Sequence, residues 1–232
     1  MMTFNGFSDA GLRFLDDLTA NNTREWFEEH KDIYKNELQE PALAFISAVG
    51  ERLQEISPAV RYDSRTNGGG SLMRINRDTR FSKDKSPYKD NISMMFWEGD
   101  GKKTEEPGFG MRIMDGNGGL ISGMFGFDKP MLEAFRQAVL DDRFGAELDK
   151  IIKTLKKQGY EIEGGDLYKK VPRGYPEDHP RADYLKFRGL YARVETLTRE
   201  TLTSPKLVDE VVGHFKAMAP LQQWLVKVKQ TI

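Results

Sequence analysis

The chain has 232 residues, no cysteine and a formal net charge of −1, from 35 Lys and Arg against 36 Asp and Glu. This length allows a sizeable core, while the absence of cysteine excludes disulfides, thiolate nucleophiles and thiolate metal sites, and fits a cytoplasmic protein. The chain does not open with a basic segment followed by an apolar one, and it contains no run of about 18 apolar residues, so we expect a soluble protein without a signal peptide or membrane span.

The first sixty residues are acidic and predict helices. They hold five Lys and Arg against eleven Asp and Glu, whereas residues 61–89 hold eight against three. Ser8 is a suitable N-cap for a first helix, and Asn22 or Thr23 can cap a second. Pro41 fits the first turn of a third helix, which should end at Ser57. The near-neutral total charge therefore conceals an acidic N-terminal part and a basic middle.

Residues 70–127 change to short apolar runs separated by turn residues, which is typical of antiparallel strands. We expect strands at Leu72–Arg77, Asn91–Trp97, Gly108–Met114 and Leu120–Phe125. The segment Asp115–Gly119 reads Asp-Gly-Asn-Gly-Gly and is the strongest hairpin signal, because Gly and Asn tolerate the positive φ of tight turns. The last two strands should therefore pair.

The C-terminal half predicts mainly helices. They are expected over residues 130–158, before an irregular loop that is rich in Gly and Pro over residues 159–188. Residues 189–232 should form a strand at Leu190–Leu197 and two helices, one begun at Ser204 and the last restarted by Pro220. Together the elements predict a single α+β domain over residues 1–232, with a central, mainly antiparallel sheet and N-terminal and C-terminal helices packed on it.

The segment Arg74–Lys89 carries most of the sequence's chemistry. Three of its guanidinium groups fall within seven residues and present forked donors that match phosphate or carboxylate oxygens. On a strand, Ile75 and Arg77 would share one face, so Arg77 should need a buried acidic partner, either Asp78 or an acid of the N-terminal helices. The alternative is a structural network of ion pairs that fixes an irregular loop to the sheet.

The same segment holds a motif, Arg-x-x-Arg-Asp-x-Arg-Phe, over residues 74–81. It is preceded by Asn21-Asn22 and by Arg24-Glu-Trp-Phe27, and it is followed by Pro172-Arg-Gly-Tyr175 and by Asp178-His-Pro180. In this order the motifs resemble, over nearly the whole chain, a family of bacterial proteins with fungal relatives that is classed as domain of unknown function 2461. The resemblance implies family membership and carries no catalytic role with it.

The remaining motifs give weaker signals. His179, in the irregular loop, has the chemistry of a general acid or base near neutral pH, although it can equally cap or pack a turn. The Gly-rich run Asn67–Ser71 indicates a hairpin turn, with an anion cradle as the alternative. Neither a P-loop, a serine-hydrolase elbow nor a metal-ligand spacing is present, so no metal ligand is expected.

The sequence thus favours a binding protein or enzyme for a small anionic ligand, and it leaves the cofactor, the oligomeric state and any catalysis open. The expected ligand-binding residues are Arg74, Arg77, Asp78, Arg80, Lys85, Tyr88, Arg181 and Lys186, and the candidates for proton transfer are His179 and Asp84. One alternative is a nucleic-acid-associated module, although the near-neutral charge counts against it. The other is a non-catalytic protein whose acidic and basic parts mate between protomers.

Overall fold

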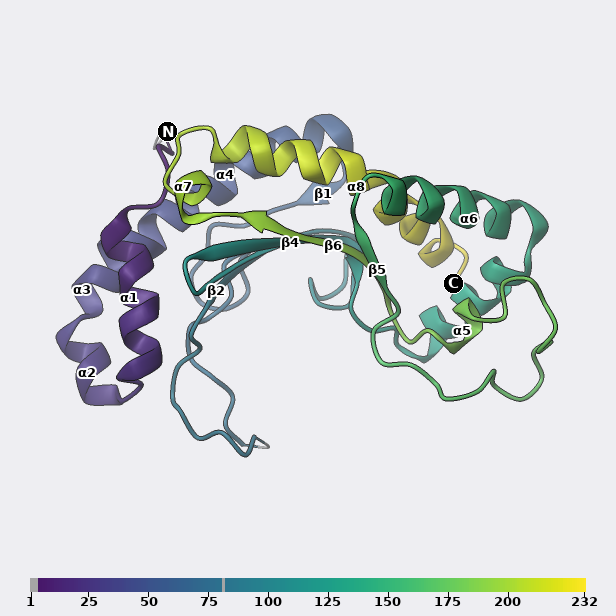
Figure 1. Ribbon diagram of the computed structural model, residues 1–232, viewed down its shortest axis with the longest axis horizontal. Helices are drawn as coiled ribbons and strands as arrows, with labels where there is room; N and C mark the ends of the chain where they lie inside the picture. Colours follow the sequence, from purple (N-terminus) through teal and green to yellow (C-terminus); the bar gives the residue numbers. More distant parts are fainter. Residues whose placement is uncertain (1–3, 81) are drawn as a thin grey trace. The chain divides into compact units, whose positions relative to one another are not determined.

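The computed structural model describes residues 4–80 and 82–232 and has an α+β fold (Figure 1). Its six strands form one antiparallel sheet in the order β1-β2-β3-β4-β6-β5. The strands are β1 Val60–Arg61, β2 Ile92–Glu98, β3 Gly108–Met114, β4 Asn117–Met124, β5 Glu161–Glu163 and β6 Leu190–Leu197. The predicted fold class is confirmed. None of the described helices is long and apolar enough to cross a bilayer.

The chain divides into two compact units. Unit 1 comprises Met1–Phe96, Gly110–Leu120 and Glu195–Gly213, and unit 2 comprises Trp97–Phe109, Ile121–Val194 and His214–Ile232. Several strands and the last helix contribute residues to both units, so the division does not follow the linear sequence. A single domain over the whole chain stays a prediction.

The helices at the start of unit 1 follow one another closely (Figure 1). They are α1 Asp9–Ala20, α2 Arg24–Glu29, α3 Lys31–Ile33, the π-helical η1 Tyr34–Gln39 and α4 Glu40–Ile56. Ser8 caps α1 as expected, and Thr23, not Asn22, caps α2 through its hydroxyl. Pro41 lies in the first turn of α4, which ends before Ser57. The sequence did not predict η1, because its residues have ordinary helical composition.

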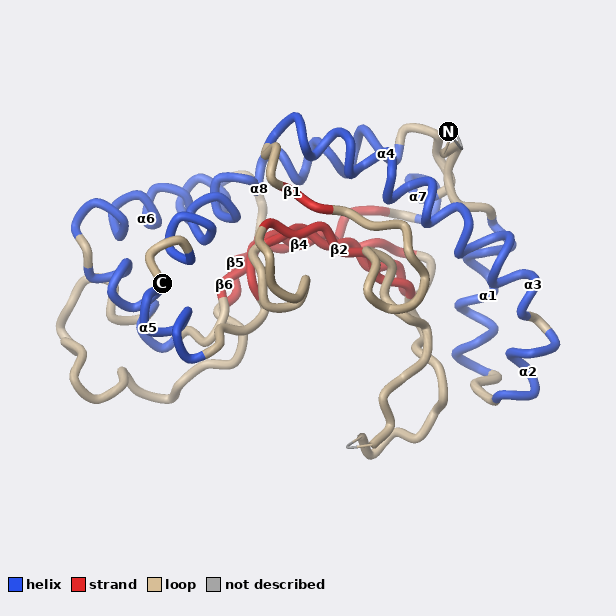
Figure 2. The backbone as a smooth tube through the Cα atoms, turned by 180° about the vertical axis from the view of Figure 1, so that it is seen from behind, coloured by secondary structure: helices blue, strands red, loops and turns tan. Residues whose placement is uncertain are grey.

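The expected strand Leu72–Arg77 does not form, and this prediction was wrong. The segment between β1 and β2 is loop (Figure 2), in which Leu72 and Asn76 make only isolated bridges, to Met94 and Tyr88. The segment makes only scattered backbone hydrogen bonds, such as those from Met73 to Ser93 of β2 and from Arg77 to Pro87, which do not add up to a continuous ladder. The charged side chains of Lys85 and Lys89 bond to carbonyls within the segment itself.

The other expected strands do form. β3 and β6 have the predicted bounds, and β2 and β4 begin within a few residues of them. Asp115 and Gly116 form the two-residue turn between β3 and β4 with φ of 52° and 67°, the left-handed values that this kind of hairpin needs. Neighbouring positions of β3 and β4 in the sheet confirm the predicted pairing.

The remaining helices lie later in the chain. They are α5 Lys129–Leu140, α6 Asp142–Lys157, the short 3-10 helix η2 Tyr184–Lys186, α7 Arg199–Leu202 and α8 Leu207–Lys229. Contrary to the expectation, α8 does not restart at Pro220 but continues through it. Pro220 is exposed, while Met218, Leu221 and Trp224 around it are buried, so core packing holds the helix together across the missing N–H.

Candidate functional site

The segment Arg74–Lys89, here called the basic loop, belongs to unit 1 and is anchored to its helices through Tyr88. The Tyr88 ring stacks on Phe27 of α2, with ring centroids 4.0 Å apart and an interplanar angle of 14°. Asn22 accepts a hydrogen bond from the Tyr88 amide and donates one to the Tyr88 carbonyl, both at 3.1 Å. Burial raises the pKa of the Tyr88 hydroxyl. Tyr88 is therefore built into the framework of the loop.

Arg77 holds the two arms of the basic loop together. Its side chain is 27% exposed, and its Nη1 lies 3.0 Å from Oδ2 of Asp84. Its Nε donates to the Tyr88 carbonyl at 3.1 Å, and its amide donates to the Pro87 carbonyl at 2.9 Å. Both expected partners of Arg77, Asp78 and an acid of the N-terminal helices, were wrong, because the basic loop brings its own Asp84 to the guanidinium instead.

Asp78 is engaged by Arg80. The guanidinium donates through Nε to Oδ1 at 3.0 Å and through Nη2 to Oδ2 at 2.7 Å. These bonds, above all other influences, lower the pKa of Asp78 to about 2. Lys85 donates to the Thr79 carbonyl at 2.8 Å. Three of the predicted ligand-binding side chains therefore already have partners within the loop.

Asp84 was a candidate for proton transfer. It accepts hydrogen bonds from the Ser86 amide at 2.9 Å and from the Ser86 hydroxyl at 2.7 Å, and these bonds together with Arg77 lower its pKa. A carboxyl group that is so readily ionised carries no proton to donate near neutral pH. The geometry therefore favours Asp84 as the acceptor that fixes Arg77.

Arg74, Arg77 and Lys89 lie close together in the basic loop and form a group that we call the cation cluster, in which Arg77 is paired with Asp84. Nζ of Lys89 donates to the Arg74 carbonyl at 2.7 Å. The Arg74 guanidinium makes no ion pair with a carboxylate among the residues described, although its charge contributes to the lowered pKa of Asp78. Burial, followed by the charges of Arg74 and Arg77, lowers the pKa of Lys89. Gly68 supports the cluster, because at its φ of +89° a Cβ would come within 2.8 Å of Cδ of Arg74.

The other predicted site residues belong to unit 2 and have local partners. Nδ1 of His179 accepts from the Arg181 amide at 3.1 Å, as a turn-capping histidine would. Arg181 donates to Asp149 of α6 at 2.9 Å and to the Val139 carbonyl of α5 at 2.8 Å. Lys186 pairs with Asp183. These contacts hold the irregular loop of unit 2 to its helices.

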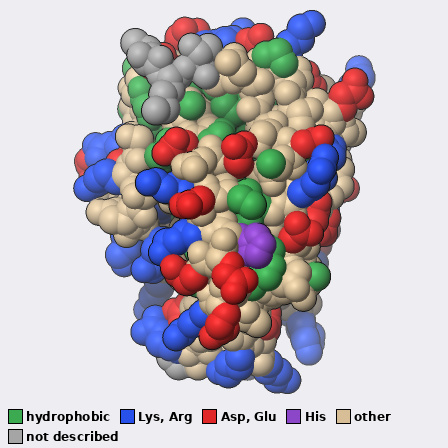
Figure 3. Space-filling model, turned by 90° about the vertical axis from the view of Figure 1, so that its left-hand side faces the viewer, with side chains coloured by type: hydrophobic (Ala, Val, Ile, Leu, Met, Phe, Trp, Pro, Cys, Tyr) green, Lys and Arg blue, Asp and Glu red, His purple; other side chains and the backbone are tan. Residues whose placement is uncertain are grey.

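Charged side chains of both signs lie on the face of the molecule that carries the N-terminal helices. Figure 3 views this face and shows acidic and basic side chains mixed over it. Among the described residues, no group of three or more His, Asp or Glu side chains is arranged to hold a metal ion. The sequence did not single out Lys89, which is set beside Arg74 by its backbone hydrogen bond to Ile75, at 2.8 Å, and by its side-chain bond to the Arg74 carbonyl. Phe81 of the motif lies outside the described residues.

The whole arrangement can be compared with known proteins. No curated protein matches the chain significantly. A protein family described as "Conserved hypothetical protein (DUF2461)" matches residues 10–224, a range that includes the basic loop and its anchors on α2. Since this match covers most of the 232 residues, the chain belongs to the DUF2461 family.

Proposed function

We propose that the protein binds a small anionic ligand, bearing a phosphate or carboxylate group, through the cation cluster of Arg74, Arg77 and Lys89. The observation that carries the proposal is the environment of Lys89. Its ammonium group is partly buried and lies near two guanidinium groups, while its hydrogen bond goes to a neutral carbonyl. Like charges in partly buried surroundings raise the free energy of the charged forms, and an anion between them would relieve this.

The three side chains suit different parts of this task. The Arg74 guanidinium offers a planar fork of donors to an oxyanion, whereas Lys89 offers a compact point charge. Arg77 already donates to Asp84 and Tyr88, so it contributes mainly its charge and the fixed geometry of the loop. Arg80, which is paired with Asp78, is assigned to the shape of the loop.

The proposal makes no catalytic assignment. Asp84 is assigned as the ion-pair partner of Arg77, and His179 of unit 2 is assigned as the cap of its own turn. The earlier candidates Arg181 and Lys186 are left out of the anion site, because each has an acidic partner within unit 2.

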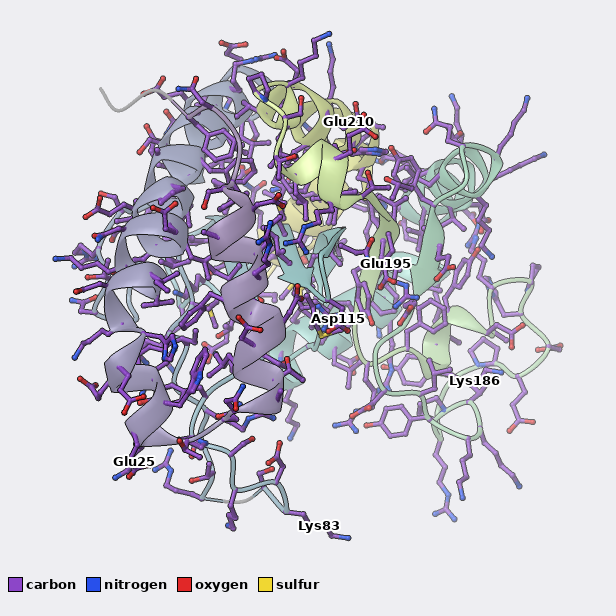
Figure 4. The ribbon with its side chains drawn as sticks, turned by 60° about the vertical axis from the view of Figure 1, so that its left-hand side comes forward. Glu25, Lys83, Asp115, Lys186, Glu195 and Glu210 are labelled. Atoms are coloured by element: carbon purple, nitrogen blue, oxygen red, sulfur yellow. The ribbon has the colours of Figure 1, made fainter. Side chains whose placement is uncertain are left out.

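Thermal shift and calorimetry with inorganic phosphate, pyrophosphate and citrate test the proposal. An anion at a hundred times its Kd should stabilise the fold by about 2.7 kcal/mol, which raises Tm by roughly 5–10 °C for a chain of this size. The variants Arg74→Ala and Lys89→Met should weaken this response. Lys83→Ala is the matched control, since Lys83 carries the same charge in the same loop but points away from it into solvent (Figure 4).

The outcomes separate the alternatives. No response to any of the three anions, or an equal loss in all three variants, would contradict a site built on the cation cluster. A complex with single-stranded or duplex DNA or RNA that weakens steeply with salt, in place of an anion response, would favour the nucleic-acid alternative. Oligomers that dissociate as salt is raised would favour charge-driven assembly.

A further inference from the structure

A second positively charged feature lies in unit 2, at Arg136 on α5. The residue is only 8% exposed, yet its Nε and Nη2 are buried without a hydrogen-bond partner among the described residues. These two nitrogens form one edge of the guanidinium group, the edge whose parallel N–H bonds match the two oxygens of a carboxylate or phosphate. A buried donor without a partner is costly, so this edge calls for an explanation.

Arg136 lies over the rings of two tyrosines. Its Cζ lies 5.2 Å from the ring centroid of Tyr168 and 5.3 Å from that of Tyr175. Such rings stabilise the cation through their faces. The Tyr175 hydroxyl and the Glu133 carboxylate also interact with Arg136, but its Nε and Nη2 stay without a hydrogen-bond partner among the described residues. These contacts therefore position Arg136, while the edge of Nε and Nη2 keeps its capacity to bind an oxyanion.

The cover over Arg136 is itself cationic and lightly held. Between the two tyrosines the chain carries Lys169, Lys170 and Arg173, all exposed and without a carboxylate partner among the residues described. The Tyr175 hydroxyl holds this segment to α5 through one hydrogen bond, to Glu133 at 2.8 Å. A segment with exposed backbone and few contacts opens at low cost in free energy.

We propose that Arg136 is the centre of a second anion site, distinct from the cation cluster, that takes a ligand with at least two negative charges. One oxyanion, carboxylate or phosphate, accepts two hydrogen bonds from Nε and Nη2 of Arg136. Its remaining charge meets Lys170 and Arg173 on the cover. Entry requires the segment to lift at its Tyr175 end, which breaks the bond between Tyr175 and Glu133, while the Tyr168 amide stays bonded to the Lys186 carbonyl.

The direct test follows the Nε–H signal of Arg136 by NMR in the full-length protein. Pyrophosphate and succinate serve as the two probes, because they present the two oxyanions on small molecules that each carry at least two negative charges at neutral pH. Saturating concentrations of at least one probe should shift the Arg136 Nε–H signal strongly, as a new charge-assisted hydrogen bond does. The probe that causes the shift identifies the oxyanion. An unchanged signal with both probes would overturn the proposal.

Variants distinguish a binding site from a structural arginine. Arg136→Met keeps the length of the side chain and should abolish the binding event, with Tm unchanged or raised because an unsatisfied buried cation is removed. The double variant Lys170→Ala/Arg173→Ala, which alters only the exposed cover, should weaken binding about tenfold or more. Lys102→Ala, an exposed cation of the same unit, is the control. Wild-type binding in both Arg136→Met and the double variant would refute the site.

The two anion sites can fail separately. Lys89→Met should remove the binding event of unit 1 and leave the Arg136 signal responsive, and Arg136→Met should do the reverse. A response of the Arg136 signal that disappears in Lys89→Met would contradict an independent site.

Discussion

Replacing Arg77 with alanine tests the structural part of this account. The substitution removes a cationic donor from the Tyr88 carbonyl, 3.1 Å away, and such bonds contribute about 1.5–3 kcal/mol. The carbonyl keeps its second partner, Asn22, so we expect the lower end, a loss of about 1.5 kcal/mol in the free energy of unfolding. For a chain of this size that corresponds to a fall in Tm of roughly 3–6 °C.

Calorimetry and hydrogen exchange measure the effect. The amides of residue 77 and Lys89, which bond to the Pro87 and Ile75 carbonyls, should exchange faster in Arg77→Ala because the two arms of the loop separate. Arg80→Ala is the control, since Arg80 is exposed and pairs with Asp78 of the same turn, and its Tm should stay near the wild-type value. Equal losses of Tm in Arg77→Ala and Arg80→Ala would refute the assignment of Arg77 as the loop's internal support.

Three further predictions follow from single contacts. NMR titration should give Asp78 a pKa of about 2, and Arg80→Ala should return this pKa toward its ordinary value of 3.8. The stability that the pair contributes should be fully present above pH 3.8 and lost as the pH falls through about 2. The Tyr191 hydroxyl of β6 donates to Glu163 of β5 at 2.6 Å, and burial, followed by this bond, raises the pKa of Tyr191 to about 12. Ultraviolet titration should find this value, and stability should fall as the pH rises from 10 toward 12. Glu163→Gln should lower the Tyr191 pKa only in part, because burial contributes most. If α8 is continuous at Pro220, Pro220→Ala should raise the free energy of unfolding by about 1–2 kcal/mol, and Tm with it. If the helix breaks there, the variant should have an unchanged or lower Tm.

Much of the fold was predictable because local signals agree with the tertiary structure. The Asp-Gly turn after β3 requires positive φ at both positions, and few residue pairs other than this one adopt it without strain. Ser8 and Thr23 supply the hydroxyls that cap their helices, as their positions before apolar runs suggested. The prediction failed at Pro220, where burial on both sides of the proline outweighs its poor helix propensity.

The candidate sites were predictable only in part. The density of charge in the basic loop indicated Arg74 and Arg77 as candidate site residues. The composition could not predict which acidic side chain pairs with which basic one, because the pairing depends on where the loop turns. Arg136 gave no signal, because one arginine in an amphipathic helix resembles any solvated residue of a helix surface. Its burial arises from Tyr168 and Tyr175, which lie more than thirty residues later in the chain.

The most direct test of the central claim is the pKa of Lys89, measured by NMR of its side chain with and without saturating pyrophosphate. The account predicts a pKa below the ordinary 10.5 in the free protein, because burial and the charges of Arg74 and Arg77 disfavour the ammonium form. It also predicts that bound pyrophosphate raises this pKa, since an anion favours the charged form. A Lys89 pKa that stays the same when pyrophosphate is added would contradict an anion site at the cation cluster.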